Sequence, residues 1–173
     1  MAKTDNFFIR AYVTPDDAGF AQTEIDLGSY VNLGVKGATA LRIIGIEGEW
    51  VASDGNAPTM DANKAGWAAW QLTTQSQSSM IRLDDTSLIA KGQLWCRNAD
   101  GSNAQVPADA YSDSHLPQFY HDGYLVATDA MFLGGYGDAD WTDGSDLTFS
   151  CMIECRLEKV TQANAVSLAL SQQ

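Results

Sequence analysis

The sequence predicts an all-β protein built as an antiparallel sandwich or barrel. Apolar and polar residues alternate along several segments, most regularly in LTFSCMIECRLE at 147–158, where every second residue is apolar. Turn-forming clusters of Gly, Pro, Asn and Asp separate these segments, and no convincing long helix lies between them. Alternation is typical of strands with one buried face, and strands without intervening helices argue against βαβ units.

The N-terminal half contains four of the expected strands. FFIRAYV stops at the turn signal TPDDAG, and QTEIDLGSYV alternates until NLGVKG closes it. The long segment ATALRIIGIEGEWV has two interior glycines, Gly45 and Gly48, which indicate a bulge or a close neighbour. In WAAWQLTTQS, alternation places Trp67 and Trp70 on opposite faces. These strands are expected at residues 7–13, 22–31, 38–51 and 67–76.

The C-terminal half contains three more strands and the one helix candidate. SLIAKGQLWCR ends at the turn NADG, residues 98–122 are expected to form a loop, and SMIRL at Ser79–Leu83 is a short eighth strand candidate. The tail VTQANAVSLALSQQ favours a helix with Thr161 as its N-cap, although its alternating Val and Leu residues also fit a strand. The three strands are expected at residues 87–97, 123–137 and 147–158.

Length and charge narrow the class of protein. The 173 residues are expected to form one domain, residues 1–173, with a core of its own. No apolar run approaches the roughly 20 residues that span a bilayer, and MAKTDNFFIRAY lacks a signal-peptide profile, which predicts folding in a cytoplasm. The net charge is −12 with only ten Lys and Arg residues, so direct nucleic-acid binding is not expected.

The three cysteines fit packing better than chemistry. Cys151 and Cys155 share one face of the expected strand but lie about 13 Å apart along it. A disulfide tolerates a Cα separation of only roughly 7 Å. Cys96 has the same parity as the apolar residues of its own segment. Free cysteine is often fully buried as a small hydrophobe, so we interpret all three as core residues.

One acidic loop is a candidate calcium site. Four carboxylates in a Gly-bearing loop could gather oxygens around a hard cation, but the EF-hand pattern is missed, because Gly144 falls one place late and Phe149 occupies the position of the bidentate Glu. A solvated turn is the favoured interpretation, and a calcium site is the alternative. The candidate ligands are Asp138, Asp140, Asp143 and Asp146.

No pattern for catalysis is present. His115 and His121 match no standard metal spacing, and there is no nucleophile elbow, phosphate loop or HExxH motif. We therefore expect a protein without enzymatic activity. The five tryptophans could line a sugar-binding face, but core and interface positions are more usual in a sandwich. The expected exposed interface anchors are Trp67, Trp95 and Trp141.

A family resemblance rests on two features of the sequence: many strands in a compact chain, and the ending SCMIECRLEKVTQANAVSLALSQQ. This ending reads as a long last strand followed by a short amphipathic tail. In this layout the chain resembles the single jelly-roll capsid proteins of small tailless viruses of archaea and bacteria with an internal membrane. The resemblance implies an eight-stranded antiparallel jelly-roll sandwich of two four-stranded sheets, with a short C-terminal helix or strand extension. It carries over no site residues.

The resemblance also implies a function. The chain would be a major capsid subunit that assembles with copies of itself, or with a second capsid protein, into an icosahedral shell of a virion after folding in the host cytoplasm. The segment MAKTDNFF offers only Lys3 as a cation, so the inner surface would face a membrane or another protein rather than nucleic acid. The alternatives are a phage decoration, tail or fibre protein, and a carbohydrate-binding β-sandwich module.

Overall fold

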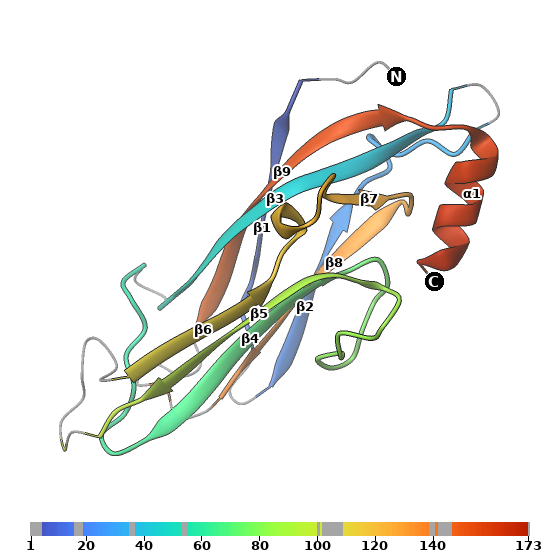
Figure 1. The fold of residues 1–173 in the computed structure, drawn as a ribbon. Helices are drawn as coiled ribbons and strands as arrows, with labels where there is room; N and C mark the ends of the chain where they lie inside the picture. The colour runs from blue at the N-terminus through green and yellow to red at the C-terminus, as the bar shows by residue number, and fades with distance from the viewer. Residues whose placement is uncertain are drawn as a thin grey trace.

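Two antiparallel sheets lie face to face (Figure 1). The computed structural model describes residues 5–15, 19–34, 37–52, 55–99, 101, 109–138, 141 and 147–172. The four-stranded sheet contains, in spatial order, β1 (Phe7–Val13), β9 (Thr148–Lys159), β3 (Thr39–Val51) and β7 (Tyr124–Val126). The five-stranded sheet contains β2 (Phe20–Asp26), β8 (Ala130–Gly137), β4 (Ala65–Thr73), β5 (Leu88–Arg97) and β6 (Asp109–His115).

The strand order is that of a jelly roll. Successive strands repeatedly cross from one sheet to the other, so that β9 lies between β1 and β3, and β8 lies between β2 and β4. Every pairing between neighbouring strands is antiparallel. The predicted jelly-roll sandwich is therefore confirmed, with β6 as an additional strand at one edge.

The core lies between the inner faces of the two sheets. Alternation in β9 turns Phe149, Cys151, Ile153 and Cys155 inward, and all four are buried. The Phe149 ring stacks on Trp70 of the opposite sheet, with ring centroids 4.7 Å apart, and also contacts Trp50 at 5.2 Å. Large aromatic surfaces from both sheets thus meet in one continuous apolar layer, which drives the sheets together.

Two glycines of β3 have the roles that the sequence indicated. The register of β3 against β9 shifts between Ile43 and Gly45, so Gly45 lies at a bulge. A Cβ added at Gly48 would overlap the ring of Phe149, closer than the 3.0 Å that real Cβ atoms respect. Gly48 therefore provides the space that the inward Phe149 ring occupies.

The structure corrects several expected boundaries. The segment 22–31 leaves the sheet after Asp26, because Leu27 begins a turn in which its carbonyl accepts from the Tyr30 and Val31 amides. The expected loop 98–122 contains β6, a polar edge strand that pairs with β5. The single expected strand 123–137 is two strands, β7 and β8, which belong to different sheets.

The expected eighth strand at Ser79–Leu83 is wrong. This segment belongs to an ordered connection between β4 and β5 that folds over the outer face of the five-stranded sheet. The buried Gln71 side chain donates to the Ser79 carbonyl (3.0 Å) and accepts from the Ile81 amide (2.8 Å). Lys91 Nζ donates to the same Ile81 residue's carbonyl (2.8 Å). These side chains satisfy backbone groups that a neighbouring strand would otherwise pair.

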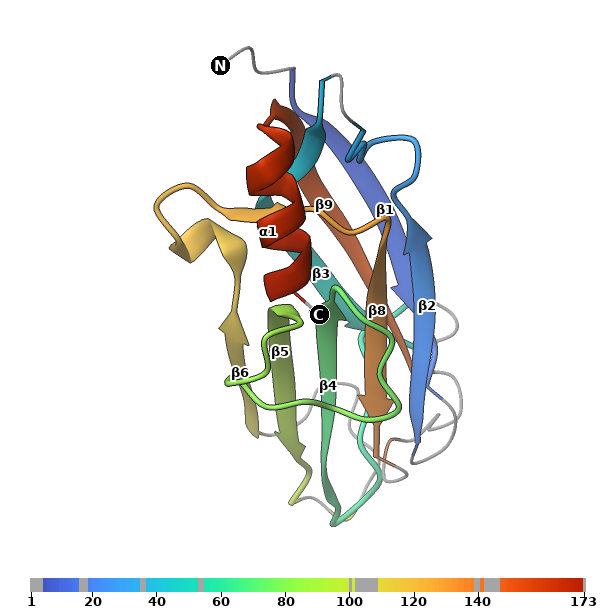
Figure 2. The ribbon, with the colours of Figure 1, turned by 90° about the vertical axis from the view of Figure 1, so that its right-hand side faces the viewer.

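The tail forms helix α1 (Gln162–Ser171), as favoured from the sequence, and it packs across one end of the sandwich (Figure 2). The Thr161 hydroxyl caps it by accepting from the Asn164 amide at 3.3 Å. Within the helix only Ala165 is buried, whereas Gln172, just after it, is 3% exposed. No helix of the described ranges has the length and hydropathy of a membrane-spanning helix.

Gln172 joins the helix to both sheets. Its Nε2 donates to the Leu125 carbonyl (2.6 Å) and its Oε1 accepts from the Ala127 amide (3.2 Å), beside β7. Its backbone carbonyl accepts from Thr74 Oγ1 (2.6 Å), just after β4. Because the helix itself buries little apolar surface, these hydrogen bonds hold it in place.

We expect Gly48→Ala to lower the free energy of unfolding by about 1–3 kcal/mol, because the new methyl group forces the Phe149 ring or the β9 backbone to move. Urea denaturation followed by circular dichroism measures the change. Gly101→Ala is the matched control, since among the described residues no atom lies within 4 Å of a Cβ placed there. Equal stability of the two variants would contradict the close packing at Gly48.

Gln172→Ala is expected to lower the free energy of unfolding by about 1–3 kcal/mol, because it leaves the Leu125 carbonyl and the Ala127 amide without partners. The same denaturation experiment applies. Gln162→Ala removes an exposed glutamine from the other end of the helix and should change stability by less than about 0.5 kcal/mol. A loss shared equally by both variants would contradict the role of Gln172.

Candidate functional site

The cysteines are structural, as the sequence predicts. All three are free and buried. Burial raises the pKa of the Cys151 and Cys155 thiols to about 12, and that of the Cys96 thiol to about 11. A nucleophile or a metal ligand must be a thiolate at neutral pH. These environments favour the neutral thiol, so the three sulfurs act as apolar packing groups.

The acidic loop lies largely outside the described residues. Asp138 is described; it is half-buried, and its amide donates to the Trp67 carbonyl at 3.2 Å. Asp140, Asp143 and Asp146 are not described, and the calcium site stays a prediction. Within the described ranges, no three or more His, Cys, Asp or Glu side chains gather as a metal site would require.

The two histidines do not come together in a metal site of the described residues. His115 ends β6 and forms a hydrogen bond through Nε2 with the Tyr120 hydroxyl, while the two rings meet edge to face. His121 is exposed in the turn that follows the short 3₁₀ helix η1 (Pro117–Phe119).

Two of the three predicted interface tryptophans form an aromatic row on the outer face of the five-stranded sheet. Trp67 stacks on Trp95 of β5, with centroids 5.9 Å apart and planes 21° apart. On its other side Trp67 stacks on Tyr136 of β8, with a centroid distance of 4.7 Å. Trp95 is 49% exposed and Trp67 is partly buried. The row presents an apolar ridge of the kind that anchors protein interfaces.

The expectation that Trp141 is exposed is wrong. Its side chain is 3% exposed and packs in a small second cluster with Met60, Cys96 and Leu147. Its indole Nε1 donates to the Trp67 carbonyl at 3.5 Å. The surrounding sequence is acidic and turn-like, but the indole itself is large enough to fill a gap at the end of the sandwich.

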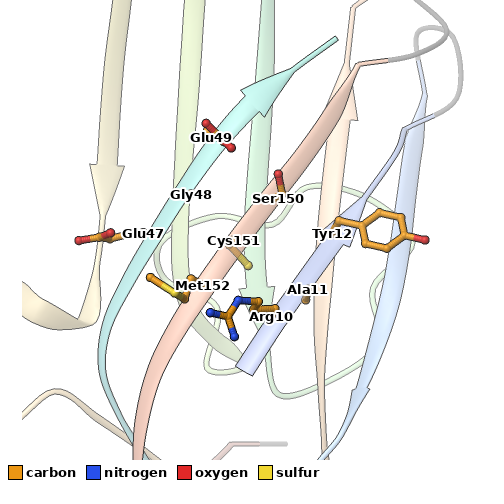
Figure 3. A pocket seen from close by; sticks show the side chains of 9 residues that line it. All are labelled: Arg10, Ala11, Tyr12, Glu47, Gly48, Glu49, Ser150, Cys151 and Met152. Atoms are coloured by element: carbon orange, nitrogen blue, oxygen red, sulfur yellow. The ribbon is translucent and has the colours of Figure 1, made fainter. Parts of the chain in front are cut away.

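The outer face of the four-stranded sheet carries a hollow of about 500 Å³ over β1, β9 and β3 (Figure 3). The antiparallel registers arrange its outward side chains in two rows across the sheet. One row is Arg10, Met152 and Glu47, and the other is Tyr12, Ser150 and Glu49. Figure 3 shows Glu47 and Glu49 projecting from β3 at one side, and Tyr12 from β1 at the other.

The hollow has negative groups at one side and a positive group at the other. Glu47 and Glu49 are exposed on β3, and the exposed cation Arg10 lies two strands away on β1, at about 10 Å between the backbones. No carboxylate of the described residues lies within 4.0 Å of Arg10. A further acid of this face, Glu154, accepts from Asn6 Nδ2 at 2.6 Å. Among the described residues, the hollow therefore offers the cation Arg10 and the carboxylates Glu47 and Glu49 without an ion-pair partner, with the apolar Met152 between them.

This arrangement suits binding rather than catalysis. Ser150 is the one hydroxyl of β9 in the hollow, and no histidine borders it within the described residues. A serine without an adjacent base is a weak nucleophile. Glu47 and Glu49 lie on an open face, where water solvates both charges. The groups present can form ion pairs, hydrogen bonds and apolar contacts with a partner surface.

Sequence reasoning missed the hollow and one member of the aromatic row. The signal for Arg10 and Tyr12 was available, because both belong to the polar parity of FFIRAYV. Their placement beside Glu47 and Glu49 depends on β9 lying between β1 and β3, which no local pattern reveals. Tyr136 was likewise not singled out.

The strand order defines a jelly-roll protein, and comparisons with known proteins agree about this fold. No protein-family model matches the sequence, and no curated protein sequence is significantly similar to it. Solved structures of viral VP1 capsid proteins are similar to it. New Jersey polyomavirus VP1 matches 91% of this chain and 100% of its own, with 8% identity and a TM-score of 0.52.

Two further VP1 structures match at similar levels. Human Polyomavirus 12 VP1, in complex with 3'-sialyllactosamine, covers 91% of this chain and 100% of its own, at 9% identity and a TM-score of 0.50. Merkel cell polyomavirus VP1, in complex with GD1a oligosaccharide, covers 90% and 96%, at 10% identity and a TM-score of 0.50. At sequence identities this low, the structural similarity establishes a shared fold and nothing more. The predicted resemblance to viral jelly-roll proteins is therefore confirmed for the fold.

We expect the native thiols to resist modification by a disulfide reagent at pH 8. With a pKa of about 12, roughly one Cys151 thiol in ten thousand is ionised at that pH. The reaction should be at least about a hundredfold slower than in guanidinium-unfolded protein. In the unfolded protein all three thiols should react. Rapid reaction of the native protein at Cys151 or Cys155 would contradict the packing role.

Proposed function

We propose that this protein is a capsid subunit that assembles with copies of itself into a viral shell. The observation that carries the proposal is the jelly-roll fold, which is similar to New Jersey polyomavirus VP1 over 91% of this chain and 100% of that chain. A shell subunit needs a rigid body with surfaces left free for its neighbours. Both requirements are properties of this fold, because the inner faces form the core, while the hollow of the four-stranded sheet and the Trp95 end of the five-stranded sheet remain exposed.

The outer surfaces supply suitable contacts. The aromatic row on the five-stranded sheet exposes Trp95, and the hollow on the four-stranded sheet exposes Tyr12 at 66%. Exposed Phe8 lies on the same face of β1. Aromatic side chains contribute a large share of binding energy when they become buried at interfaces. Further contacts come from the sheet edges, where β1, β2, β6 and β7 each pair on one side only among the described strands.

The charges favour protein or membrane partners over nucleic acid. The net charge is −12, and the cations are dispersed. Arg42, for example, is engaged by Glu158 through bonds of 2.5 and 3.1 Å, and by the Asp122 carbonyl at 2.9 Å. The hydrogen bond to Glu158 raises the pKa of Arg42 above its usual value. A cation already paired within the protein is poorly placed to neutralise phosphate.

The finer parts of the proposal follow the family resemblance. We propose a virion location, assembly in the host cytoplasm, and an inner surface that faces an internal membrane or a second capsid protein, as in the tailless viruses of archaea and bacteria. The chain would act without enzymatic activity and as one domain. A decoration, tail or fibre protein is the nearest alternative, because it would share the β-sandwich and form small oligomers instead of shells.

Carbohydrate binding is a second candidate function. Two of the similar VP1 proteins are in complex with 3'-sialyllactosamine or GD1a oligosaccharide, and Trp95 is exposed here. The geometry of the aromatic row weakens this candidate. Tyr136, Trp67 and Trp95 stack on one another, so most of their ring faces are already covered. A sugar that stacks on an aromatic face would have only the end of the row.

Electron microscopy of the purified protein, with sedimentation velocity, tests the proposal. We expect closed shells or regular capsomers. Trp95→Ala should raise the protein concentration required for assembly at least about tenfold. Trp95 is half exposed, so the variant should keep its circular dichroism spectrum. Uniform monomers at all concentrations would contradict the proposal, and monomers whose tryptophan fluorescence shifts with glycans would favour the carbohydrate candidate.

A further inference from the structure

We propose that the hollow over β1, β9 and β3 binds the same hollow of a second copy of this chain, as a two-fold symmetric contact. The inference rests on the proposed self-assembly and names the surface that carries it. Its basis is the division of charge in the hollow, with Arg10 at one side, Glu47 and Glu49 at the other, and Met152 between them.

A surface that binds itself about a two-fold axis must be complementary to itself, so each group must meet its counterpart from the other half of the patch. The axis that satisfies this condition runs along β9. Rotation about it places β1 of each copy over β3 of the other, while the position along the strands is unchanged. Arg10, Met152 and Glu47 occupy one row, so Arg10 of one copy faces Glu47 of the other, and Met152 faces Met152.

The second row is complementary in the same way. Tyr12, Ser150 and Glu49 are in register across the three strands. The rotation brings the Tyr12 phenol, whose hydroxyl is a donor, over the Glu49 carboxylate of the other copy. Each contact occurs twice. The dimer would thus hold two Arg10–Glu47 pairs and two Tyr12–Glu49 pairs around a centre of methionine side chains.

The exposed charged groups of the hollow have no ion-pair partner among the described residues of their own chain, which supports a contact with a second copy. Arg10, Glu47 and Glu49 are exposed, and within the described residues none has an ion pair with its own chain. The long Arg10 and Tyr12 side chains are also able to fill a hollow of about 500 Å³ opposite them. A patch of one charge sign would repel itself in a protein of net charge −12. Here opposite charges face each other, which sets the register of the contact.

Charge exchange between copies provides the test. In Arg10→Glu, both Arg10–Glu47 pairs of the dimer become acid against acid; in Glu47→Lys/Glu49→Lys, both become cation against cation. We expect each variant alone to dimerise at least about tenfold more weakly than the wild type by sedimentation equilibrium. Mixing the two variants restores opposite charges at both contacts between positions 10 and 47, and keeps one of the two Tyr12–Glu49 contacts, so the mixture should form heterodimers that are at least about tenfold tighter than either variant alone.

The triple variant Arg10→Glu/Glu47→Lys/Glu49→Lys should dimerise by itself, because it exchanges the signs of both charges in each Arg10–Glu47 pair. Circular dichroism checks that each variant is folded, as expected for substitutions at exposed positions. Glu24→Lys, an exposed acid on β2 of the other sheet, controls for the change in net charge and should not weaken the dimer.

The inference is overturned if the mixture is as weak as the separate variants, or if the single-sided variants associate as well as the wild type. In either case, a wild type that still assembles would leave the proposed function standing, with copies meeting through another surface such as the aromatic row. A wild type that stays monomeric at every concentration would contradict both.

Discussion

The structure depends on the packing of Phe149 between the two sheets. This ring stacks on Trp70 of the facing sheet and contacts Trp50 of its own sheet, so the three aromatic side chains join the inner faces of the two sheets. The contact requires glycine at two neighbouring positions. A Cβ at Gly48 would overlap Phe149, and one at Gly92 would overlap the Trp70 indole. The aromatic rings and the glycines beside them are therefore one packing unit, in which a change to either affects both.

From this unit the rest of the fold follows. The strand that carries Phe149, β9, lies between β1 and β3 and has the most regular alternation in the chain. Its inward side chains form the core, and its outward side chains, Ser150 and Met152, form the floor of the hollow. The same alternation that buries one face of β9 thus determines which residues lie on the outer face.

The regular strands were predictable because burial of one face imposes a period of two. That signal located β1, β3, β5 and β9 to within two residues, and it assigned the cysteines to the core. It failed for β6, because the sequence DAYSDSH has few apolar residues and this edge strand is defined by its pairing with β5. It also merged β7 with β8, because a continuous apolar run does not show where the chain changes sheet.

The candidate sites were less predictable than the fold. Trp67 and Trp95 were found because a strand pattern assigns their faces, whereas Trp141 was misplaced because it lies outside any strand and only tertiary packing buries it. The hollow escaped notice because its residues come from three strands that are distant in sequence. Surfaces of this kind become visible only when the register between strands is known, since a shift of one residue would turn Arg10 inward.

The central claim is that the outer faces of the jelly roll serve association with other copies. A cryo-electron microscopy reconstruction of the assembled protein, at a resolution that shows side chains, tests this claim most directly. The account predicts that Arg10, Tyr12 and Trp95 are buried between copies, with the inner packing of Phe149 unchanged. An assembly in which both outer faces remain open to solvent would contradict it.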